Sequence, residues 1–468
     1  MEDEVEMFDW EDEALEDRCL DLQGKNIAAK DIGAFLQSLD GLDDVSRLKV
    51  VNLEGNRIGS KNENMAPIDT LLAASSGSLT ALNLCRNPLG EEQRHLGPLV
   101  ALANTLASLS RLKVLDISHC CLIGLAGHRY HGLNALGGTF ASTKHSLTHL
   151  RISDNGLHSE AALIVGGWLA SMKKLRYLDM SRNPLARDPL GQHSRSGFDP
   201  LCGALRTASH LRTLLLREVG IDDGEAERVA SFLALSVRLE KLDLSENQIH
   251  VRGARHLAGA LRSNGSLLSL LLAHNAIGNE GALLLAAVIP HAASLAEIDV
   301  SSNGLTGGGS DRRVKEAFVE AALASVSIET FGLSGNDFPP ADVEEMQEYA
   351  SANVELRAVA DAPESYDLWK TSSIVETCLV KKFDRLPPGV AGVLKSNATF
   401  VDEEGPMREA VLAASPLTKE ELLRSSPGAV GLATKVKAAG PSSSWIQSAM
   451  DAPEDFVALD DGGGDDGF

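Results

Sequence analysis

Aliphatic residues recur at a fixed spacing along most of this chain. In one copy of the pattern, Leu239, Leu242 and Leu244 are followed by Asn247 and Ile249. The same letters return 28 residues later, at Leu267, Leu270, Leu272, Asn275 and Ile277. Eleven copies lie in phase between residues 18 and 340, so the chain is expected to be one repeat array.

Each copy predicts a short strand followed by a turn. The two leucines of Leu-x-Leu lie on one face of a strand because side chains alternate with period two. We therefore expect the leucines to point into the core and the intervening residue to point outward. The asparagine position turns the chain, where its amide can bond backbone groups that the turn leaves unpaired.

The remainder of each copy predicts a helix. Ala254, Leu257, Ala258 and Leu261 follow the helical spacing of i, i+3, i+4 and i+7. A strand and a crossover helix, repeated, give parallel strands on a concave face and helices on a convex face. We expect residues 15–39 to close one end of the array and a helix over 343–349 to close the other.

The eleven copies resemble the leucine-rich repeat family, specifically its ribonuclease-inhibitor-like class. The resemblance implies an α/β solenoid, a right-handed βα horseshoe of about eleven repeats, followed by a largely irregular C-terminal tail. It also implies that cysteine is tolerated at the asparagine position, where Cys120 stands. Val219 takes the same position without a hydrogen-bonding group, so a local irregularity is expected there.

Charge divides the chain into three parts. Residues 1–17 carry ten acids and no base, and residues 341–468 carry 23 acids and 11 bases. Residues 18–340 hold 32 of each, although the net charge of the chain is −22. We therefore assign an acidic N-terminal segment to 1–17, the solenoid to 18–340 and an acidic, mostly disordered tail to 341–468.

Composition and the N-terminal sequence indicate a cellular compartment and exclude some classes of partner. Six scattered cysteines do not form a disulfide framework, and the N-terminus lacks the features of a signal peptide. Apolar stretches are too short to cross a membrane. We therefore expect a cytoplasmic protein with no membrane partner. A solenoid without excess positive charge is also a poor partner for nucleic acid.

Two kinds of segment break the period. Extra length follows the turn in three copies, at residues 123–139, 186–200 and 307–313, all on the strand-to-helix edge. Such insertions can form a binding edge or be neutral surface variation. In the tail, residues 365–383 and 444–459 are apolar islands that either dock on a partner as linear motifs or pack back onto the solenoid.

No catalytic or cofactor-binding motif stands out, so we expect neither an enzyme nor a cofactor site. His119, Cys120, Cys121, His128 and His131 are residue types that zinc prefers. Cys120, however, occupies an inward-facing position of the repeat, which favours a structural cysteine. No metal site is therefore expected.

The expected partner-binding surface is the concave face, with the insertion edge as an alternative. Leu215 and Leu271 interrupt a run of charged outward positions, and exposed apolar residues beside charges suit a protein-binding surface. The candidate partner-binding residues are Arg86, His119, Arg151, Asp154, Asp179, Arg182, Leu215, Arg217, Asp243, Glu246, Leu271 and His274.

The first functional hypothesis is a non-enzymatic scaffold that binds another protein. A second follows from a resemblance to Ran GTPase-activating proteins, which share the repeat count and an acidic C-terminal segment. That family places a functional arginine after an early turn, whereas here Glu91 follows Leu89-Gly90 and the nearest arginine is Arg94. A structural subunit of an axonemal or other large assembly is the third.

Overall fold

The computed structural model describes residues 18–39, 44–60, 63–90, 97–123, 130–142, 146–306 and 312–361. Side chains are described for these residues except 141–142 and 355–361. The acidic segment 1–17, Arg94 and both apolar islands of the tail lie outside these ranges. The assignments made for them stay predictions.

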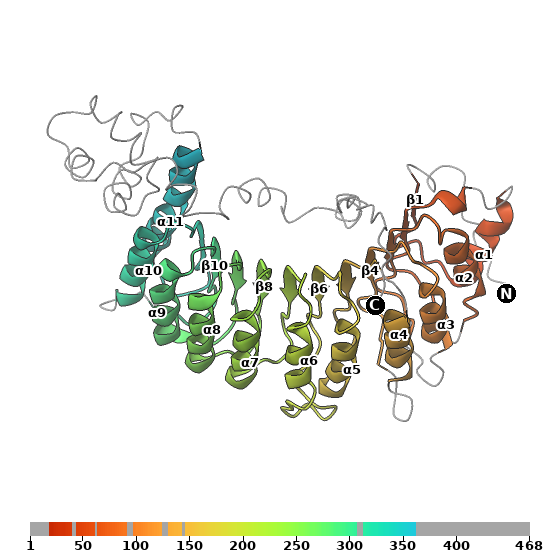
Figure 1. The fold of residues 1–468 in the computed structure, drawn as a ribbon, viewed down its shortest axis with the longest axis horizontal. Coiled ribbons are helices and arrows are strands. Elements are labelled where there is room, and N and C mark those ends of the chain that lie inside the picture. The colour runs from red at the N-terminus through yellow and green to blue at the C-terminus, as the bar shows by residue number, and fades with distance from the viewer. Residues whose placement is uncertain are drawn as a thin grey trace, which may run out of the picture.

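Eleven three-residue strands form one parallel sheet in the order in which they occur along the chain. They line the inner side of an arc, and helices cover its outer side (Figure 1). The strands are β1 Cys19–Asp21, β2 Val50–Asn52, β3 Ala81–Asn83, β4 Val114–Asp116, β5 His149–Arg151, β6 Tyr177–Asp179, β7 Thr213–Leu215, β8 Lys241–Asp243, β9 Ser269–Leu271, β10 Glu297–Asp299 and β11 Thr330–Gly332. The predicted solenoid of eleven repeats is confirmed.

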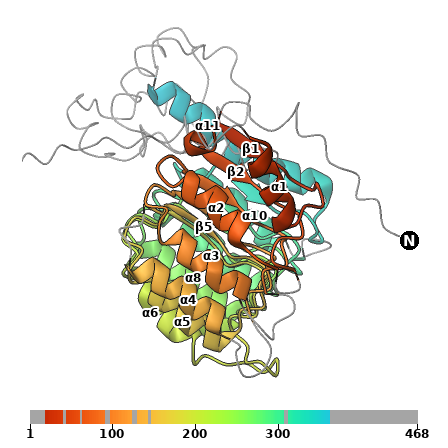
Figure 2. The same cartoon turned by 90° about the vertical axis from the view of Figure 1, so that its right-hand side faces the viewer.

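A helix follows each strand and returns the chain to the start of the next. Seen along the arc, the strands and helices form two layers (Figure 2). The helices are α1 Ala29–Ser38, α2 Ala66–Ala74, α3 Gly97–Leu106, α4 His131–Ser142, α5 Ser159–Leu169, α6 Phe198–Leu205, α7 Asp223–Leu233, α8 Val251–Ser263, α9 Gly278–Val288, α10 Arg313–Ala324 and α11 Pro340–Asp361, with 3₁₀ turns η1 Val45–Arg47 and η3 Ile289–His291.

One hydrophobic core runs through the described array. Leu242 and Leu270, from neighbouring strands, belong to the same buried cluster as Leu20 at one end and Ala350 at the other. On α8, Leu257 and the other residues that predicted its inner face are also buried. A single repeat cannot bury this face by itself, so each repeat depends on its neighbours.

The asparagine position joins adjacent repeats through backbone groups. Asn247 Nδ2 donates to the carbonyl oxygens of Leu216, 2.8 Å away in the preceding repeat, and Leu244, 2.9 Å away in its own. Its Oδ1 accepts the N–H groups of Val219 and Ile221 at 3.1 and 3.0 Å. One buried amide therefore satisfies four backbone groups that the turns would leave unpaired.

The irregularity expected at Val219 does not reach the sheet, although Gly220 directly after it takes a left-handed φ of 80°. β7 pairs with β6 and β8 in the register used along the rest of the sheet. The physical reason is that both neighbours supply amides. Asn247 accepts the Val219 N–H, and Asn183 Nδ2 donates to the Met180 carbonyl at 2.9 Å.

The closing helix is longer than the predicted 343–349, since α11 begins at Pro340 and ends at Asp361. Met346 and Ala350 bury its inner face against the last repeat. Gln347 bonds the last strand: its Oε1 accepts the Phe331 N–H at 2.9 Å, and its Nε2 donates to the Glu329 carbonyl at 3.0 Å. The first part of the segment assigned to the tail is therefore an ordered cap.

Candidate functional site

The candidate residues fall into two rows along the concave face. The first, which we name the strand row, is the last residue of each strand and contains Arg151, Asp179, Leu215, Asp243 and Leu271. These five are consecutive partners in the parallel ladder. The period-two reading of Leu-x-Leu therefore places them correctly, in one continuous line.

The second row, which we name the turn row, is the residue just before the asparagine position. Six candidates belong to it: Arg86, His119, Asp154, Arg182, Glu246 and His274. Each has a positive φ, between 50° and 57°. This left-handed conformation disfavours residues that carry a Cβ atom, yet it lets the chain turn sharply out of the strand. Arg217, the remaining candidate, directly precedes Glu218, another member of the turn row.

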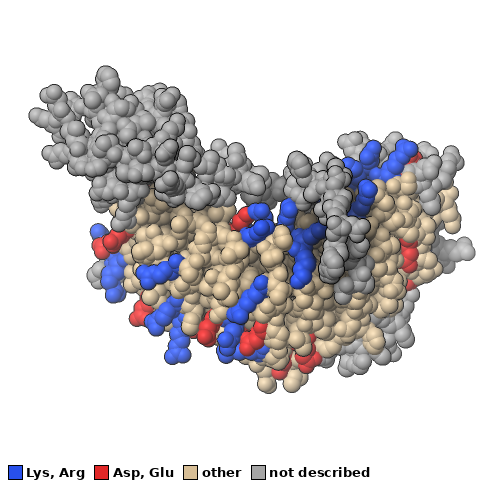
Figure 3. Space-filling view, in the orientation of Figure 1, with Lys and Arg blue, Asp and Glu red and all other residues tan. Residues whose placement is uncertain are grey.

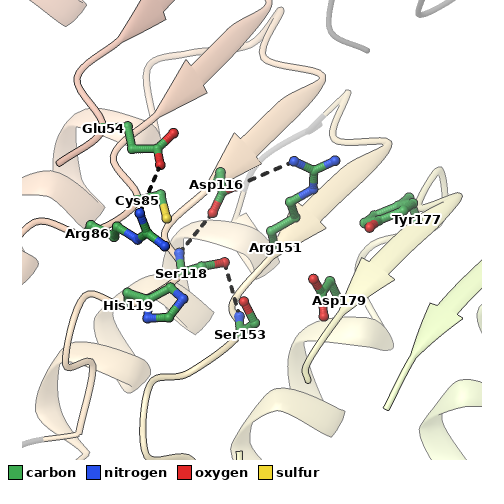
Figure 4. Close-up of a pocket in the computed structure, with 10 residues that line it drawn as sticks. All are labelled: Glu54, Cys85, Arg86, Asp116, Ser118, His119, Arg151, Ser153, Tyr177 and Asp179. Carbon is green, nitrogen blue, oxygen red and sulfur yellow. Dashed lines mark hydrogen bonds and ion pairs between the residues drawn. The ribbon is translucent and has the colours of Figure 1, made fainter. Parts of the chain in front are cut away.

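Repeats two to six form a hollow of about 220 Å³ on this face (Figure 4). Four candidates line it, namely Arg86, His119, Arg151 and Asp179. The other lining residues are Glu54, Cys85, Asp116, Ser118, Ser153 and Tyr177. The hollow is polar on most sides and mixes both signs of charge.

An acid, a base and an aromatic ring lie in sequence across its wall. Asp116 is only 6 % exposed and accepts the Ser118 N–H at 2.9 Å. Its Oδ2 lies 3.7 Å from Arg151 Nη1. On the other side, Arg151 Cζ lies 5.2 Å from the centroid of the Tyr177 ring, within the range of a cation–π contact. Arg151 is thus held from both sides.

Burial is the main cause of the pKa shifts of the residues around the hollow. It raises the pKa of Asp116, partly offset by hydrogen bonds from Ser118, and raises the pKa of Tyr177 to about 12. It lowers the pKa of His149, whose ring stacks on Tyr177 with centroids 5.6 Å apart, to about 4. It also raises the pKa of Cys85 to about 12, which keeps that thiol protonated and poorly nucleophilic.

Other candidates are paired across repeats. His119 Nδ1 lies 2.7 Å from Asp154 Oδ2, and Arg182 Nε lies 3.6 Å from Glu218 Oε2. Arg217 is paired with Glu246 in the same way. These contacts connect neighbouring repeats along the concave face, and the two arginine–glutamate pairs neutralise part of its charge.

The structure does not bring every candidate to the hollow. Leu215, Asp243, Leu271 and His274 lie farther along the arc, in repeats seven to nine. Leu215 and Leu271 are only partly exposed, since neighbouring side chains cover part of each. They extend the same concave face but do not share a cavity with Arg86.

Sequence reasoning missed Tyr177 and His149 as members of this site. Tyr177 and His149 are the first residues of their strands, two positions before strand-row residues. Period-two alternation places both positions on the same face, so that signal was present in the sequence. Asp116 is itself in the strand row, but its burial depends on the arginine and serine that surround it.

A second polar cluster ties the insertion at 186–200 to the start of α7. Ligand atoms of His193, Asp222 and Glu225 lie within 4.8 Å of one another, a spacing that could hold a metal ion. Arg195 Nε, however, lies 3.1 Å from Glu225 Oε1 and its Nη2 3.7 Å from Asp222 Oδ1. A cation already occupies this position, so the cluster functions as an ion-pair network.

The residue types that zinc prefers near position 120 separate in the structure. Cys120 is buried, and its Sγ contacts the carbonyl oxygens of Leu84 and Ser118 at 3.1 and 3.3 Å. It therefore takes the part that asparagine plays in other repeats, as the structural interpretation predicted. Cys121 is exposed, and His128 lies outside the described residues.

Comparison with known proteins places the chain among repeat proteins. A family model described as "Leucine Rich repeat" matches residues 143–163, 239–258 and 263–286. A ribonuclease inhibitor from Sus scrofa is 32% identical over 168 residues, which are 36% of this chain and 34% of that protein. The chain thus spans about a third of the length of this relative.

Three solved structures show a limited likeness to the chain. An internalin from Listeria monocytogenes has a TM-score of 0.33 and 19% identity, covering 64% of this chain and 84% of that one. Leiomodin-1 actin-binding site 2 has a TM-score of 0.31 and 13% identity over 37% and 98%. The tropomodulin C-terminal domain of Caenorhabditis elegans has 0.29 and 18% over 35% and 98%.

Within the described ranges, no helix is both long enough and apolar enough to cross a bilayer.

Proposed function

We propose that the chain, which is a leucine-rich repeat protein similar to the ribonuclease-inhibitor class, is a non-enzymatic scaffold that binds another protein on its concave face. The contact surface we assign is the hollow and the two rows that flank it. The Sus scrofa relative is named for inhibiting a ribonuclease. By analogy, the ligand that we propose for this chain is a protein.

The turn row supplies the observation on which the proposal rests. Glycine, which tolerates a positive φ, occupies this row in the first, second and last repeats as Gly24, Gly55 and Gly335. The eight repeats between them carry side chains there instead, at Arg86, His119, Asp154, Arg182, Glu218, Glu246, His274 and Ser302. A left-handed residue with a Cβ atom costs about 1 kcal/mol. Side chains retained at that cost indicate that the face uses them.

The wall of the hollow supports the same surface. Tyrosine and arginine are the residue types most often found at the centres of protein–protein contacts. Arg151 is held in place by Asp116 and Tyr177 before any partner arrives, so little conformational freedom would be lost on binding. The central hollow, rather than the leucines of repeats seven to nine, is therefore the proposed anchor.

Glycine substitutions in the turn row test the proposal because they remove side chains without adding backbone strain. Arg86→Gly combined with Arg182→Gly removes two side chains and relieves backbone strain, so the fold should be retained or slightly stabilised. Proteins captured from cell extract by the full chain and by this variant are compared by quantitative mass spectrometry. We expect at least one captured protein to fall about tenfold or more, the effect of losing ~1.4 kcal/mol of contact energy.

Ser302→Gly is the matched control. It makes the same backbone change in a repeat outside the hollow and should leave the captured set unchanged. Tyr177→Ala should reduce the same protein as the double variant. A captured set that is identical for the full chain, for the double variant and for Tyr177→Ala would show that the concave face is not the binding surface.

The GTPase-activator hypothesis stays a prediction, because Arg94 lies outside the described residues. It is tested directly by GTP hydrolysis with Ran. Acceleration that disappears in Arg94→Ala would support it and contradict the non-enzymatic proposal, and no acceleration would remove it. The hypothesis of a structural subunit differs from the scaffold only in the identity of the partner.

A further inference from the structure

The residue just before each strand forms a third row, on the helix-to-strand edge of the arc. Each member's carbonyl oxygen accepts the N–H of the next, as in Lys49 N to Arg18 O and Thr80 N to Lys49 O, both at 2.8 Å. The row therefore stacks along the whole array. It reads Arg18, Lys49, Thr80, Lys113, Thr148, Arg176, Arg212, Glu240, Leu268, Ala296 and Glu329.

This row is polarised along the arc. Five of its first seven members are basic and the other two are threonines, whereas its last four are acidic or uncharged. The space-filling view shows lysine and arginine side chains spread over the visible face of the molecule, with aspartate and glutamate side chains interspersed (Figure 3). The neutral total of residues 18–340 therefore conceals a basic edge on the first seven repeats.

The basic edge contains a groove of about 520 Å³ over the first five repeats. We name it the edge groove. Every residue that lines it is a cation or carries a hydroxyl: Arg18, Ser46, Arg47, Lys49, Ser78, Thr80, Ser110, Arg111, Lys113 and Ser146. This uniform sign distinguishes it from the hollow on the concave face.

Several hydroxyls of the edge groove already serve the fold. Ser78 Oγ donates to the carbonyl oxygens of Ser46 and Leu48, each at 2.7 Å, and Thr80 Oγ1 donates to that of Lys49 at 3.0 Å. Ser146 bonds the preceding repeat in the same way as Ser78. These bonds fix the floor of the groove, so the cations are the groups that remain for a ligand.

The cations are placed to receive negative charge. Arg18, Arg47, Lys49 and Arg111 are exposed, and among the described residues none of the four is in an ion pair. Like charges held in a row repel one another, and an anionic chain that follows the row relieves this repulsion. The ligand that fits is an extended polypeptide with closely spaced carboxylates.

We propose that the edge groove binds this chain's own acidic segment, residues 1–17. That segment holds ten carboxylates and no base, the highest density of acid in the chain. Asp17 is bonded to Arg18, which itself lines the groove. The tether thus begins at the binding site, which raises the effective concentration of the segment to roughly the millimolar range.

Chain length permits the contact. Neighbouring strands are about 4.8 Å apart, so the five repeats of the groove span about 20 Å. Seventeen residues in extended form reach about 55 Å. The segment can therefore follow the whole row. A carboxylate-rich partner would have to displace it, which makes the segment a competitor for any acidic ligand of the same groove.

Zero-length cross-linking with a carbodiimide tests the proposal on the full chain, because it joins a carboxylate to a lysine only when they touch. Trypsin releases residues 1–18 as one peptide, which makes the products easy to identify. We expect cross-links from this peptide to Lys49 and to Lys113, which lies two strands beyond Lys49. Their yield should fall several-fold as salt is raised.

Arg47→Glu combined with Arg111→Glu reverses charge in the groove while leaving both reactive lysines in place. This variant should lose most of the Lys113 cross-link. Arg238→Glu combined with Arg255→Glu changes the net charge equally on exposed positions elsewhere and should keep it. Equal loss in the two variants would overturn the proposal.

Two other outcomes would also overturn it. Cross-links to Lys113 that come from the carboxylates of residues 451–468, in place of the 1–18 peptide, would assign the groove to the other acidic end. Absence of cross-links from the 1–18 peptide, together with binding of an RNA oligonucleotide or phosphatidylserine vesicles that the groove variant loses, would assign it to a different class of ligand.

Discussion

Asn247 shows how one side chain determines the spacing of two repeats. Its amide satisfies two carbonyls and two N–H groups, which lie in its own repeat and the preceding one. No other group of comparable size could reach all four, since donor and acceptor must sit on one short side chain. The same arrangement recurs at Asn155 and Asn183.

Asn247→Ala should therefore be among the most damaging single changes. It leaves three buried backbone groups without partners, because the Leu244 carbonyl still accepts Asn275 Nδ2 at 3.0 Å. At about 1 kcal/mol for each group, we expect a loss of about 3 kcal/mol in the free energy of unfolding. Urea denaturation followed by circular dichroism measures this loss. Gln248→Ala, at the exposed neighbouring position, should stay within about 0.5 kcal/mol of the unchanged protein; similar losses for both would contradict the argument.

His149 gives the concave face a dependence on pH. Because burial lowers its folded pKa to about 4, the unfolded chain binds a proton more readily below the ordinary value of 6.5. Its contribution to stability is complete above pH 6.5 and is lost as pH falls from 6.5 towards 4. At pH 5 the loss from this group should be about 2 kcal/mol.

The measurement compares unfolding free energies at pH 7 and pH 5 for the unchanged protein and for His149→Phe. Phenylalanine keeps the stack on Tyr177 without a titrating nitrogen. The variant should therefore lose about 2 kcal/mol less than the unchanged protein over this range. Equal losses would mean that His149 is protonated as easily in the folded state as in the unfolded one.

At the scale of elements, an insertion is tied to the repeat that follows it. Glu225 has a fully buried side chain, accepts the Asp222 N–H at 3.1 Å and pairs with Arg195 from the 186–200 insertion. Burial raises the pKa of Glu225, and the guanidinium of Arg195 opposes that rise. The insertion therefore contributes to capping α7 as well as extending the edge.

Arg195→Ala should destabilise the protein by about 1–2 kcal/mol, because it leaves a buried carboxylate without its partner while part of that loss is screened by solvent. Arg228, whose Nε lies 3.3 Å from Asp199, forms a pair in which both side chains are exposed. Arg228→Ala should change stability by less than about 0.5 kcal/mol. Thermal unfolding of both variants checks the difference in burial.

How far the sequence predicts these elements depends on how local their cause is. Leu242 and Leu257 were placed correctly because strand and helix periodicity are properties of a few neighbouring residues. The role of Arg195 was not predicted, since Glu225 lies 30 residues away and only the stacking of repeats brings the two together. Tyr177 could have been predicted, because its position follows from the same alternation that placed Asp179.

For the whole molecule, stability is expected to vary along the array. In a stack of repeats each unit is stabilised mainly by its neighbours, so the ends depend on caps. α11 closes the last repeat with Met346 and Ala350, and Asn353 Nδ2 donates to the Ile328 carbonyl at 2.6 Å. Weakening this cap should affect nearby repeats first.

Met346→Asp places a charge in the cap and should detach α11 locally. Hydrogen exchange should then speed up strongly at β10 and β11, while amides around β5 and β6 keep their protection. Ser351→Asp, on the exposed side of the same helix, is the control and should leave exchange unchanged. A uniform increase along the array would show that it unfolds as one unit.

The arrangement of the whole molecule also explains why composition did not predict the basic edge. Equal numbers of acids and bases in residues 18–340 predicted a surface without excess charge, and nucleic acid was disfavoured on that ground. The basic edge arises because residues far apart in sequence come close in the stack. Arg18 and Lys49 precede adjacent strands although they are 31 residues apart, and Lys113, 64 residues after Lys49, lies two strands farther on. Net charge cannot report this, since it carries no information on position.

Gln347 has a consequence beyond the single chain. A parallel sheet that ends in solvent offers its outermost strand to any other strand that can add to it. By bonding the Phe331 N–H and the Glu329 carbonyl, this side chain occupies hydrogen-bonding sites that the first strand of a second copy would need. Without it, head-to-tail addition has no natural stopping point, and contacts of that kind grow into filaments rather than closed oligomers. Gln347 thus helps to prevent the protein from assembling into filaments.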